Sequence, residues 1–304
     1  MGIRTKAEVV FDYCNYALLI VVGLAACYPF LYLLAISLNE GTDSVRGGIT
    51  FYPRHFTLVN YASILSDSLI LNAYKITILR TAIGTVSSVA ITGLVAYGLS
   101  ERRLPGRKYI MIYMLIPMFF SGGLIPYFLN LRDLGLINTF GVYVIPGMFV
   151  IWNCIVMKAF FQQIPEELKE SMRMDGANEL YILVRLIFPI SVPLFAAISL
   201  FIAVGHWNDW FAGAFFVTDF QLVPVQTYLQ SLMTRELAEF VGQNLQTKME
   251  TQFVGGTSLL DYATITSLSL KMAGVIVCMA PILIVYPFLQ KYFVKGVLIG
   301  SIKG

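Results

Sequence analysis

The sequence predicts an all-α polytopic membrane protein with six transmembrane helices. Three observations carry this prediction: only 13% of the 304 residues are charged, 57% are hydrophobic, and the charges are absent from long stretches. A soluble domain usually has about 25% charged residues, so this chain has too few charges to cover a water-facing surface. About 20 apolar residues in a helix cross the hydrocarbon core of a bilayer. The expected spans are residues 13–39, 69–100, 109–131, 134–157, 186–208 and 272–290.

The distribution of Lys and Arg predicts the orientation of these spans. With the N-terminus in the cytoplasm, the inner side holds 13 of the 21 basic residues and the outer side holds 8. The sharpest contrast is between two short connections, because Glu101–Lys108 has four basic residues and Arg132–Asp133 has one. Basic residues in short loops remain cytoplasmic. Both termini are therefore expected in the cytoplasm.

The spans form one membrane domain over residues 1–304, with loops of unequal length. An external connection over 40–68 follows the first span. A longer external loop over 209–271 precedes the last span, and an amphipathic helix is expected in it near Ser231–Phe240. Gly122 and Gly123 should break the third span near its outer end, because glycine disfavours a continuous helix.

The tail Lys291–Gly304 is expected to leave the membrane after the last span ends at Gln290. Gly296, Gly300 and Gly304 oppose helix formation beyond Val294. The apolar residues among them are better explained by burial on a protein surface or by contact with lipid headgroups than by full solvation.

No pattern of a catalytic or metal site is visible in the sequence. The four cysteines lie in or beside apolar spans without C-x-x-C spacing, and the two histidines form no H-E-x-x-H. Neither a phosphate-binding loop nor a nucleophile elbow occurs. We expect no catalytic residue, no bound metal or cofactor and no nucleic-acid partner. Transport work would have to be driven by a partner or by an ion gradient.

The connection between the fourth and fifth spans, residues 158–185, holds nine charges. Pro165 suits the first turn of a helix, and Glu166 and Glu167 complement the positive end of its dipole. Gly176 can end that helix with a positive φ. The pattern predicts a helix over Pro165–Asp175, with Leu168 and Met172 on one face, and a second helix from about Asn178. Two interpretations stay open here: a lever on the cytoplasmic surface, or a helix that only joins two spans.

The same connection resembles the EAA loop of ABC importer permeases. That pattern reads E-A-A, three residues, G, nine residues and I-x-L-P, and its Glu, Gly and Pro match Glu170, Gly176 and Pro189. The departures from the pattern are Ser171, Met172, Leu186 and Phe188. Other segments are similar to the maltose-type carbohydrate permeases, and most similar to the subgroup that serves complex oligosaccharides. These segments are Phe120–Pro126, Gly205–Phe211 and Tyr286–Gly296, so the resemblance covers about residues 10–304.

The resemblance implies the type I ABC importer permease fold in a bacterial cytoplasmic (inner) membrane, crossed several times. It implies the permease of an ATP-driven, binding-protein-dependent importer of oligosaccharides that works by alternating access. The implied partners are a second homologous permease, two ATPase subunits that bind ATP and Mg, and an extracytoplasmic solute-binding protein. It assigns the ATPase contact to Glu166, Glu167, Glu170, Met172, Asp175 and Gly176. It also directs the loop 209–271 to the binding protein and the tail Lys291–Gly304 to the ATPase.

Polar and aromatic residues at the outer ends of two spans are candidates for the substrate path. Trp207, Asn208, Asp209 and Trp210 end the fifth span. Aromatic residues at that depth often form an interfacial belt, but Trp rings also stack on sugars while Asn and Asp accept hydrogen bonds from sugar hydroxyls. Lys75 and Arg80 either snorkel to the membrane surface or face the path, where two cations would suit an acidic sugar. An ion-coupled secondary sugar transporter is the alternative, although it needs ionisable groups within its spans.

Overall fold

The computed structural model describes residues 6–234 and 265–301, and the side chains of 8–234 and 265–284. The described residues are helical, apart from turns and one isolated bridge between Asn39 and Phe56. They fall into two compact units, one made of Met1–Ser68 with Leu229–Pro281 and the other of Leu69–Tyr228 with Ile282–Gly304. The assignment of residues 1–304 to a single permease domain stays a prediction.

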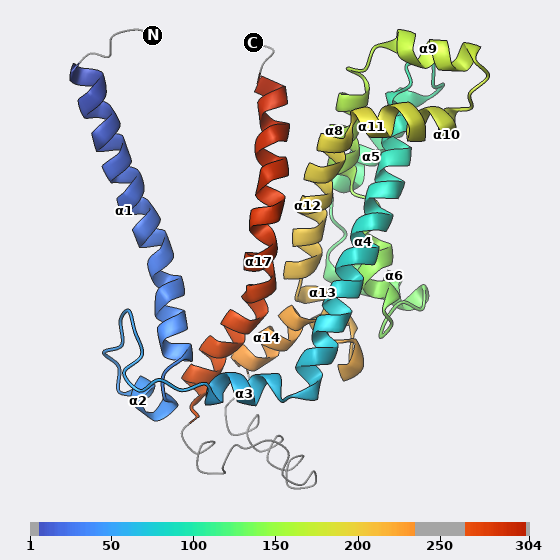
Figure 1. Ribbon diagram of the computed structural model, residues 1–304. Helices are drawn as coiled ribbons and strands as arrows, with labels where there is room; N and C mark the ends of the chain where they lie inside the picture. The colour runs from blue at the N-terminus through green and yellow to red at the C-terminus, as the bar shows by residue number, and fades with distance from the viewer. Residues whose placement is uncertain (1–5, 235–264, 302–304) are drawn as a thin grey trace. The chain divides into compact units, whose positions relative to one another are not determined.

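Three helices are long and apolar enough to cross a membrane. They are α1 (Lys6–Ser37), α4 (Ser68–Ser100) and α17 (Ser267–Ser301), drawn in Figure 1. α17 continues without interruption past Gly296 and Gly300, so the prediction that the glycines oppose a helix beyond Val294 is wrong. Each glycine costs about 1 kcal/mol relative to alanine, but extending an existing helix adds one hydrogen bond per residue and avoids the cost of nucleation.

The other three expected spans are bent helix pairs, which gives up to six spans if each pair is one span. α5 (Arg107–Phe119) and α6 (Leu124–Asp133) meet at 116°. The break predicted at Gly122 and Gly123 is confirmed, and Gly123 has φ +86°, a conformation that favours glycine. α7 (Gly141–Val144) with η1 (Ile145–Gly147) meets α8 (Ile151–Phe161) at 45°.

The fifth span begins as α10 (Glu179–Ile182), a π-helical turn η2 (Leu183–Ile187) and α11 (Phe188–Ile190). It then bends by 86° at Ser191 into α12 (Val192–Asn208). Pro193 has no N–H to donate to the carbonyl of Pro189, and its ring would clash with that carbonyl, so a straight helix through Ser191 is disfavoured. The fifth span, an apolar run in the sequence, is therefore sharply bent in the structure.

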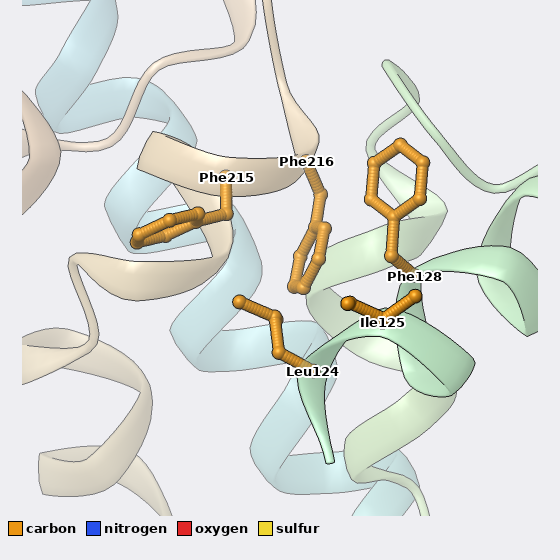
Figure 2. A pocket seen from close by; sticks show the side chains of 5 residues that line it. All are labelled: Leu124, Ile125, Phe128, Phe215 and Phe216. Carbon is orange, nitrogen blue, oxygen red and sulfur yellow. The ribbon is translucent and has the colours of Figure 1, made fainter.

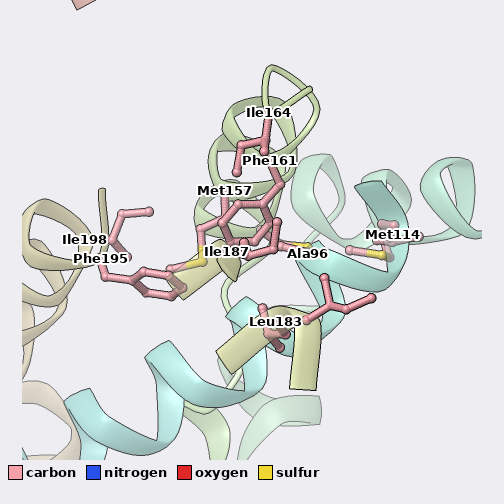
Figure 3. Close-up of a cluster of buried hydrophobic side chains, with 12 residues drawn as sticks. Ala96, Met114, Met157, Phe161, Ile164, Leu183, Ile187, Phe195 and Ile198 are labelled. Atoms are coloured by element: carbon pink, nitrogen blue, oxygen red, sulfur yellow. The ribbon is translucent and has the colours of Figure 1, made fainter. Parts of the chain in front are cut away.

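A buried apolar cluster joins α4, α5, α8 and the segment from α10 to α12 in the second unit. Met157 and Phe161 of α8 are fully buried and lie among the side chains labelled in Figure 3. Two residues at α9 (Glu166–Met174) also contribute: Ile164, in the turn before this helix, is part of the cluster, and Met172 of α9 packs against it. The packing of these two residues therefore holds α9 against the apolar cluster.

The other end of the second unit is held by hydrogen bonds between distant segments. α13 (Phe211–Phe216), η3 (Phe220–Leu222) and α14 (Val225–Thr234) follow α12. The Thr77 hydroxyl of α4 accepts the backbone N–H of Val225 at 2.9 Å, and the Thr227 hydroxyl donates to the Trp210 carbonyl at 2.8 Å. The helix expected near Ser231–Phe240 begins earlier, at Val225, and residues 235–264 of the expected external loop lie outside the described residues.

A buried polar network shapes the segment after α1 in the first unit. α2 (Gly41–Val45) and α3 (Val59–Leu65) lie in this segment. The side-chain amide of Asn39 donates to Asp43 and Ser44, and its oxygen accepts the backbone N–H of His55 at 2.8 Å. Asn60 donates to the carbonyls of Ser37 and Asn39 at 3.0 Å. These bonds satisfy buried polar groups that would otherwise be costly.

Candidate functional site

The predicted helix, break and second helix in the connection 158–185 are confirmed. Pro165 caps the start of α9, and Glu166 and Glu167 stand in its first turn. Gly176 has φ +81°, so it turns the chain where a side chain would be strained. Asn178 then caps α10, because its side-chain oxygen accepts the N–H of Tyr181 at 2.8 Å.

Arg173 of α9 is the centre of an ion-pair network. Its guanidinium donates to Glu101 at 2.7 Å, to Glu179 at 2.8 Å and to Glu166 at 3.1 Å. Tyr97 joins the network, since its hydroxyl donates to Glu179 at 2.6 Å. These partners belong to α9 itself, to α10, and to the end of α4 and the residue after it. We call these five residues the Arg173 network.

The network perturbs the titration of its members. The hydrogen bond to Glu179, with those to Glu101 and Glu166, raises the pKa of Arg173 above its ordinary value despite the opposing effect of burial. Burial alone would raise the pKa of Glu101. The hydrogen bonds from Arg173 and from the Arg103 N–H, with the nearby charges of Arg173 and Lys169, instead lower it below the ordinary 4.5. Both groups are thus held in their charged forms.

The residues of α9 outside the Arg173 network expose both carboxylates and apolar side chains to solvent. Glu167, Glu170 and Asp175 are exposed carboxylates, and Met174 is 87% exposed. Leu168 is also exposed, whereas Met172 packs against the apolar cluster, so these two residues differ in exposure. Glu170 pairs with Arg103 at 3.1 Å, and both of these side chains are largely in solvent. Such a pair is worth less than about 1 kcal/mol and can exchange for another partner.

A second charged pair lies at the opposite end of α4. Arg80 Nη2 donates to Asp209 Oδ2 at 2.7 Å, and the guanidinium carbon lies 4.8 Å from the centre of the Tyr143 ring. The Arg80 side chain is fully buried, whereas that of Asp209 is 36% exposed. Asp209 Oδ1 accepts the backbone N–H groups of Phe211 and Ala212. The carboxylate therefore joins the start of α13 to α4.

The other outer-end candidates are placed differently. Lys75 is exposed and Arg80 is buried. Of the two alternatives for Arg80, snorkelling to the membrane surface is therefore wrong. The ion pair of Arg80 with Asp209 lowers the cost of burying the charge. Trp207 is half-buried, Asn208 is exposed, and Trp210 is exposed with its ring 6.0 Å from that of Phe211.

An apolar hollow of about 270 Å³ lies between α6 and α13 (Figure 2). It is lined by Leu124, Ile125, Phe128, Phe215 and Phe216. All five side chains lack polar groups, so this hollow offers nothing to orient a polar solute. Within the described residues no group of three or more His, Cys, Asp or Glu side chains could hold a metal ion.

Comparison with known proteins decides the family. The family described as "binding-protein-dependent transport system inner membrane component" matches residues 89–299, which are 211 of the 304 residues. That range contains α9 and the whole Arg173 network. The chain belongs to this family. The permease is thus the multi-pass inner-membrane component of a binding-protein-dependent ABC importer, and it is not itself the catalytic subunit. Family membership excludes the ion-coupled secondary transporter.

Individual relatives match the permease over nearly its whole length. Protein LplC of Bacillus subtilis (strain 168) is 35% identical over 301 residues, which cover 99% of this chain and 97% of the relative. The polygalacturonan/rhamnogalacturonan transport system permease protein YtcP of the same organism is 35% identical over 294 residues, or 97% and 98% of the two chains.

A solved structure confirms the expected fold of the permease. A chain of a bacterial ABC transporter involved in the import of the acidic polysaccharide alginate superposes with a TM-score of 0.84 at 30% identity. The match covers 96% of this chain and 100% of that one. The expected ABC importer permease fold with about six spans is therefore confirmed, with the bends described above.

Several residues of the two charged sites were not singled out from the sequence. Arg173 lies seven residues after Glu166, on the same helix face, and this spacing could have indicated it. Glu101 and Tyr97 carry no such local signal, because they are separated from Arg173 by more than 70 residues. Tyr143 likewise reaches Arg80 only through the packing of the permease.

Proposed function

We propose that this permease imports oligosaccharides and couples their passage to ATP hydrolysis by partner subunits through α9. The partners are a second homologous permease, two ATPase subunits that bind ATP and Mg, and an extracytoplasmic solute-binding protein. Glu166, Glu167, Glu170, Met172, Asp175 and Gly176 form the ATPase contact. The permease alternates between inward-open and outward-open states.

The observation that carries the coupling proposal is the three-way ion pairing of Arg173. A helix that only joined two spans would need no ion pairs to other helices. Here Arg173 ties α9 to the residue after α4 at 2.7 Å and to the start of α10 at 2.8 Å. Force applied to the exposed face of α9 would therefore reach two membrane helices together. The exposed carboxylates and Met174 give a partner both charge and apolar area to bind.

The names of the relatives support the substrate class. One relative with 35% identity is a permease for polygalacturonan and rhamnogalacturonan, and a transporter containing a chain with 30% identity imports the acidic polysaccharide alginate. Such similarity over nearly the whole chain favours a saccharide as the cargo. Lys75, Arg80, Trp207, Asn208, Asp209 and Trp210 are our candidates for the substrate path.

Two further contacts are part of the proposal. The loop 209–271 reaches the binding protein, and its central residues 235–264 lie outside the described residues. The tail Lys291–Gly304 contacts the ATPase pair. α17 extends to Ser301, so this contact would be made by a helix end.

Purification of the complex tests the proposal. The tagged permease, extracted from its own membrane in mild detergent, should retain an ATPase whose activity rises when the sugar-loaded binding protein is added. Reconstituted vesicles should take up the sugar only with ATP inside. Uptake that needs an ion gradient and no ATP would contradict the proposal.

Two truncations test the further contacts. Deleting Glu239–Gly256 should abolish the stimulation by the binding protein and spare basal hydrolysis. Truncation after Phe293 should change the ATPase rate or the stability of the complex.

A further inference from the structure

The Arg80 guanidinium is fully buried, yet some of its N–H groups form no hydrogen bond to any described residue. Only Nη2 donates to Asp209, and Nε and Nη1 have no partner within the part of the chain that the structure describes. Buried donors left without partners cost about 1–3 kcal/mol each, and more when they are charged. A carboxylate that served only to neutralise Arg80 would be expected to bind it with both oxygens. Asp209 binds Arg80 with Oδ2, and its Oδ1 instead accepts hydrogen bonds from the backbone of α13.

Other side-chain polar atoms of α4 and α12 are also buried without a partner. Among the described residues these include the hydroxyls of Thr81 and Thr85 on α4 and the indole N–H of Trp207 on α12. Hydrocarbon supplies no water to satisfy such groups. At Arg80 itself, the two unpartnered donors and the Tyr143 ring, 4.8 Å away, offer a cation and an aromatic face. A cation beside an aromatic ring suits an anionic sugar better than a neutral apolar or a cationic ligand.

We propose that Arg80 binds the carboxylate of an acidic sugar during translocation, and that Asp209 occupies this site until the sugar arrives. This inference rests on the proposed function as a saccharide importer. The exchange replaces one carboxylate on Arg80 by another, so the buried charge stays paired throughout. Asp209 suits the role of a displaceable group because it is partly exposed and is the first non-helical residue after α12. Lys75 lies five residues earlier on α4 and is exposed, where it attracts an approaching anion.

α4 connects this site with the Arg173 network. Arg80 and Glu101 are 21 residues apart, a separation of about 30 Å along a helix. Movement of α9 that pulls on Glu101 would therefore act on the helix that carries Arg80. The release of Asp209 and the entry of a sugar can thus be timed by the ATPase.

The test compares the two halves of the ion pair in the complete complex, reconstituted in vesicles with its binding protein. Trigalacturonate is the acidic probe, and its carboxyl-reduced form is the neutral one. Arg80→Gln should lower trigalacturonate uptake about ten-fold or more, equivalent to about 1.4 kcal/mol, while stimulation of the ATPase by loaded binding protein persists. Asp209→Asn should keep or raise trigalacturonate uptake, because the competing carboxylate is gone. Arg80→Lys should restore part of the uptake, and Arg132→Gln is the exposed control.

The signs of the two effects distinguish a binding group from a structural pair. A structural pair would make Arg80→Gln and Asp209→Asn lower uptake together, in step with the thermal midpoint of the complex, and that result would overturn the inference. Unchanged trigalacturonate uptake by Arg80→Gln overturns it as well.

The unaltered complex distinguishes this inference from the proposed function. If it is stimulated by its binding protein but carries only the neutral probe, the proposed function stands and this inference fails. If no loaded binding protein stimulates the ATPase, the proposed function itself fails. Should Asp209→Asn not assemble, Lys75→Gln replaces it: selective loss of the acidic probe supports the inference, and equal loss of both probes contradicts it.

Discussion

Arg173 and Glu101 are 72 residues apart in sequence, and their side chains meet at 2.7 Å. This pair connects α9, which lies between the fourth and fifth expected spans, to the residue that follows α4. Because Arg173 also binds Glu166 and Glu179, one guanidinium fixes the orientation of α9. A planar fork with five donors suits this task, and a lysine ammonium does not replace it.

Replacing Arg173 by Met should uncouple the ATPase from transport. The change leaves three carboxylates without their common partner, and each partly exposed pair is worth about 0.2–1 kcal/mol. We expect stimulation of the ATPase by loaded binding protein to fall about five-fold or more, the effect of about 1 kcal/mol or more, while the permease still reaches the membrane. Arg173→Lys should recover part of the stimulation. Arg102→Met, an exposed arginine beside Glu101, is the matched control. Equal stimulation in the Arg173→Met and Arg102→Met complexes would contradict the coupling role.

The attachment of α9 should weaken in acid because of Glu101. Its pKa in the folded protein is lower than the ordinary 4.5, so the ionised form is favoured by folding. The stabilisation is complete above that ordinary value and is lost as the pH falls through the lower folded pKa. Amide hydrogen exchange in α9, corrected for intrinsic rates, should therefore accelerate below about pH 4.5. In a Glu101→Gln variant, exchange should be faster at neutral pH and should change less with acid. A variant that keeps the full acid response would show that another group causes it.

Gly176→Val should cost more than a surface substitution. The φ of +81° places this residue in the left-handed region, and no atom lies near an ideal Cβ there, so the cost comes from backbone strain alone. That strain is about 1–2 kcal/mol for a residue with a side chain, and more for a β-branched one. Gly176→Asn should be milder, since Asn tolerates this region. The thermal midpoint of the complex and its stimulated ATPase rate should follow the order Gly, Asn, Val. A valine variant with wild-type values of both would show that the turn can relax.

Glu170→Lys tests the exposed face of α9 directly. Glu170 pairs with the exposed Arg103, and losing this pair costs the fold less than about 1 kcal/mol. We expect normal insertion and basal stability with loss of ATPase stimulation. Glu167→Lys on the same face should act in the same direction. If Glu170→Lys transports normally, the contact with the ATPase lies elsewhere on the permease.

The parts of this fold that depend on local chemistry could be predicted, and those that depend on long-range packing could not. Pro165, Gly176 and Asn178 each act on their own backbone, so the helix, the break and the next helix follow from the sequence. The bends at Gly123 and Ser191 reach 116° and 86°. Only the glycine break was predicted, although Pro193 stands beside the second bend. Hydropathy measures whether a run is apolar and not whether it is straight. The pairing of Arg80 with Asp209 spans 129 residues, and no spacing rule indicates it.

Gly84 and His206 provide the last prediction, because they bring α4 and α12 into close contact. A Cβ at Gly84 would overlap His206 Nε2, and a Cβ at Gly147 would lie 3.5 Å from His206 Cε1. The imidazole therefore fills the space between these two glycines. Gly84→Ala forces the ring to move, and overpacking of this kind costs about 1–3 kcal/mol. Because Asp209 follows His206 by three residues, the displacement should also loosen the Arg80–Asp209 pair.

Gly98→Ala is the matched control for this substitution, since Gly98 lies in the same helix with open space around its Cβ position. It should be neutral or stabilising, because alanine favours a helix by about 1 kcal/mol over glycine. The thermal midpoint of the purified complex should fall for Gly84→Ala and not for Gly98→Ala. Adding His206→Ala to Gly84→Ala should recover stability beyond the sum of the single effects, as expected for residues in contact. Strict additivity of the two substitutions would show that the ring is not what Gly84 accommodates.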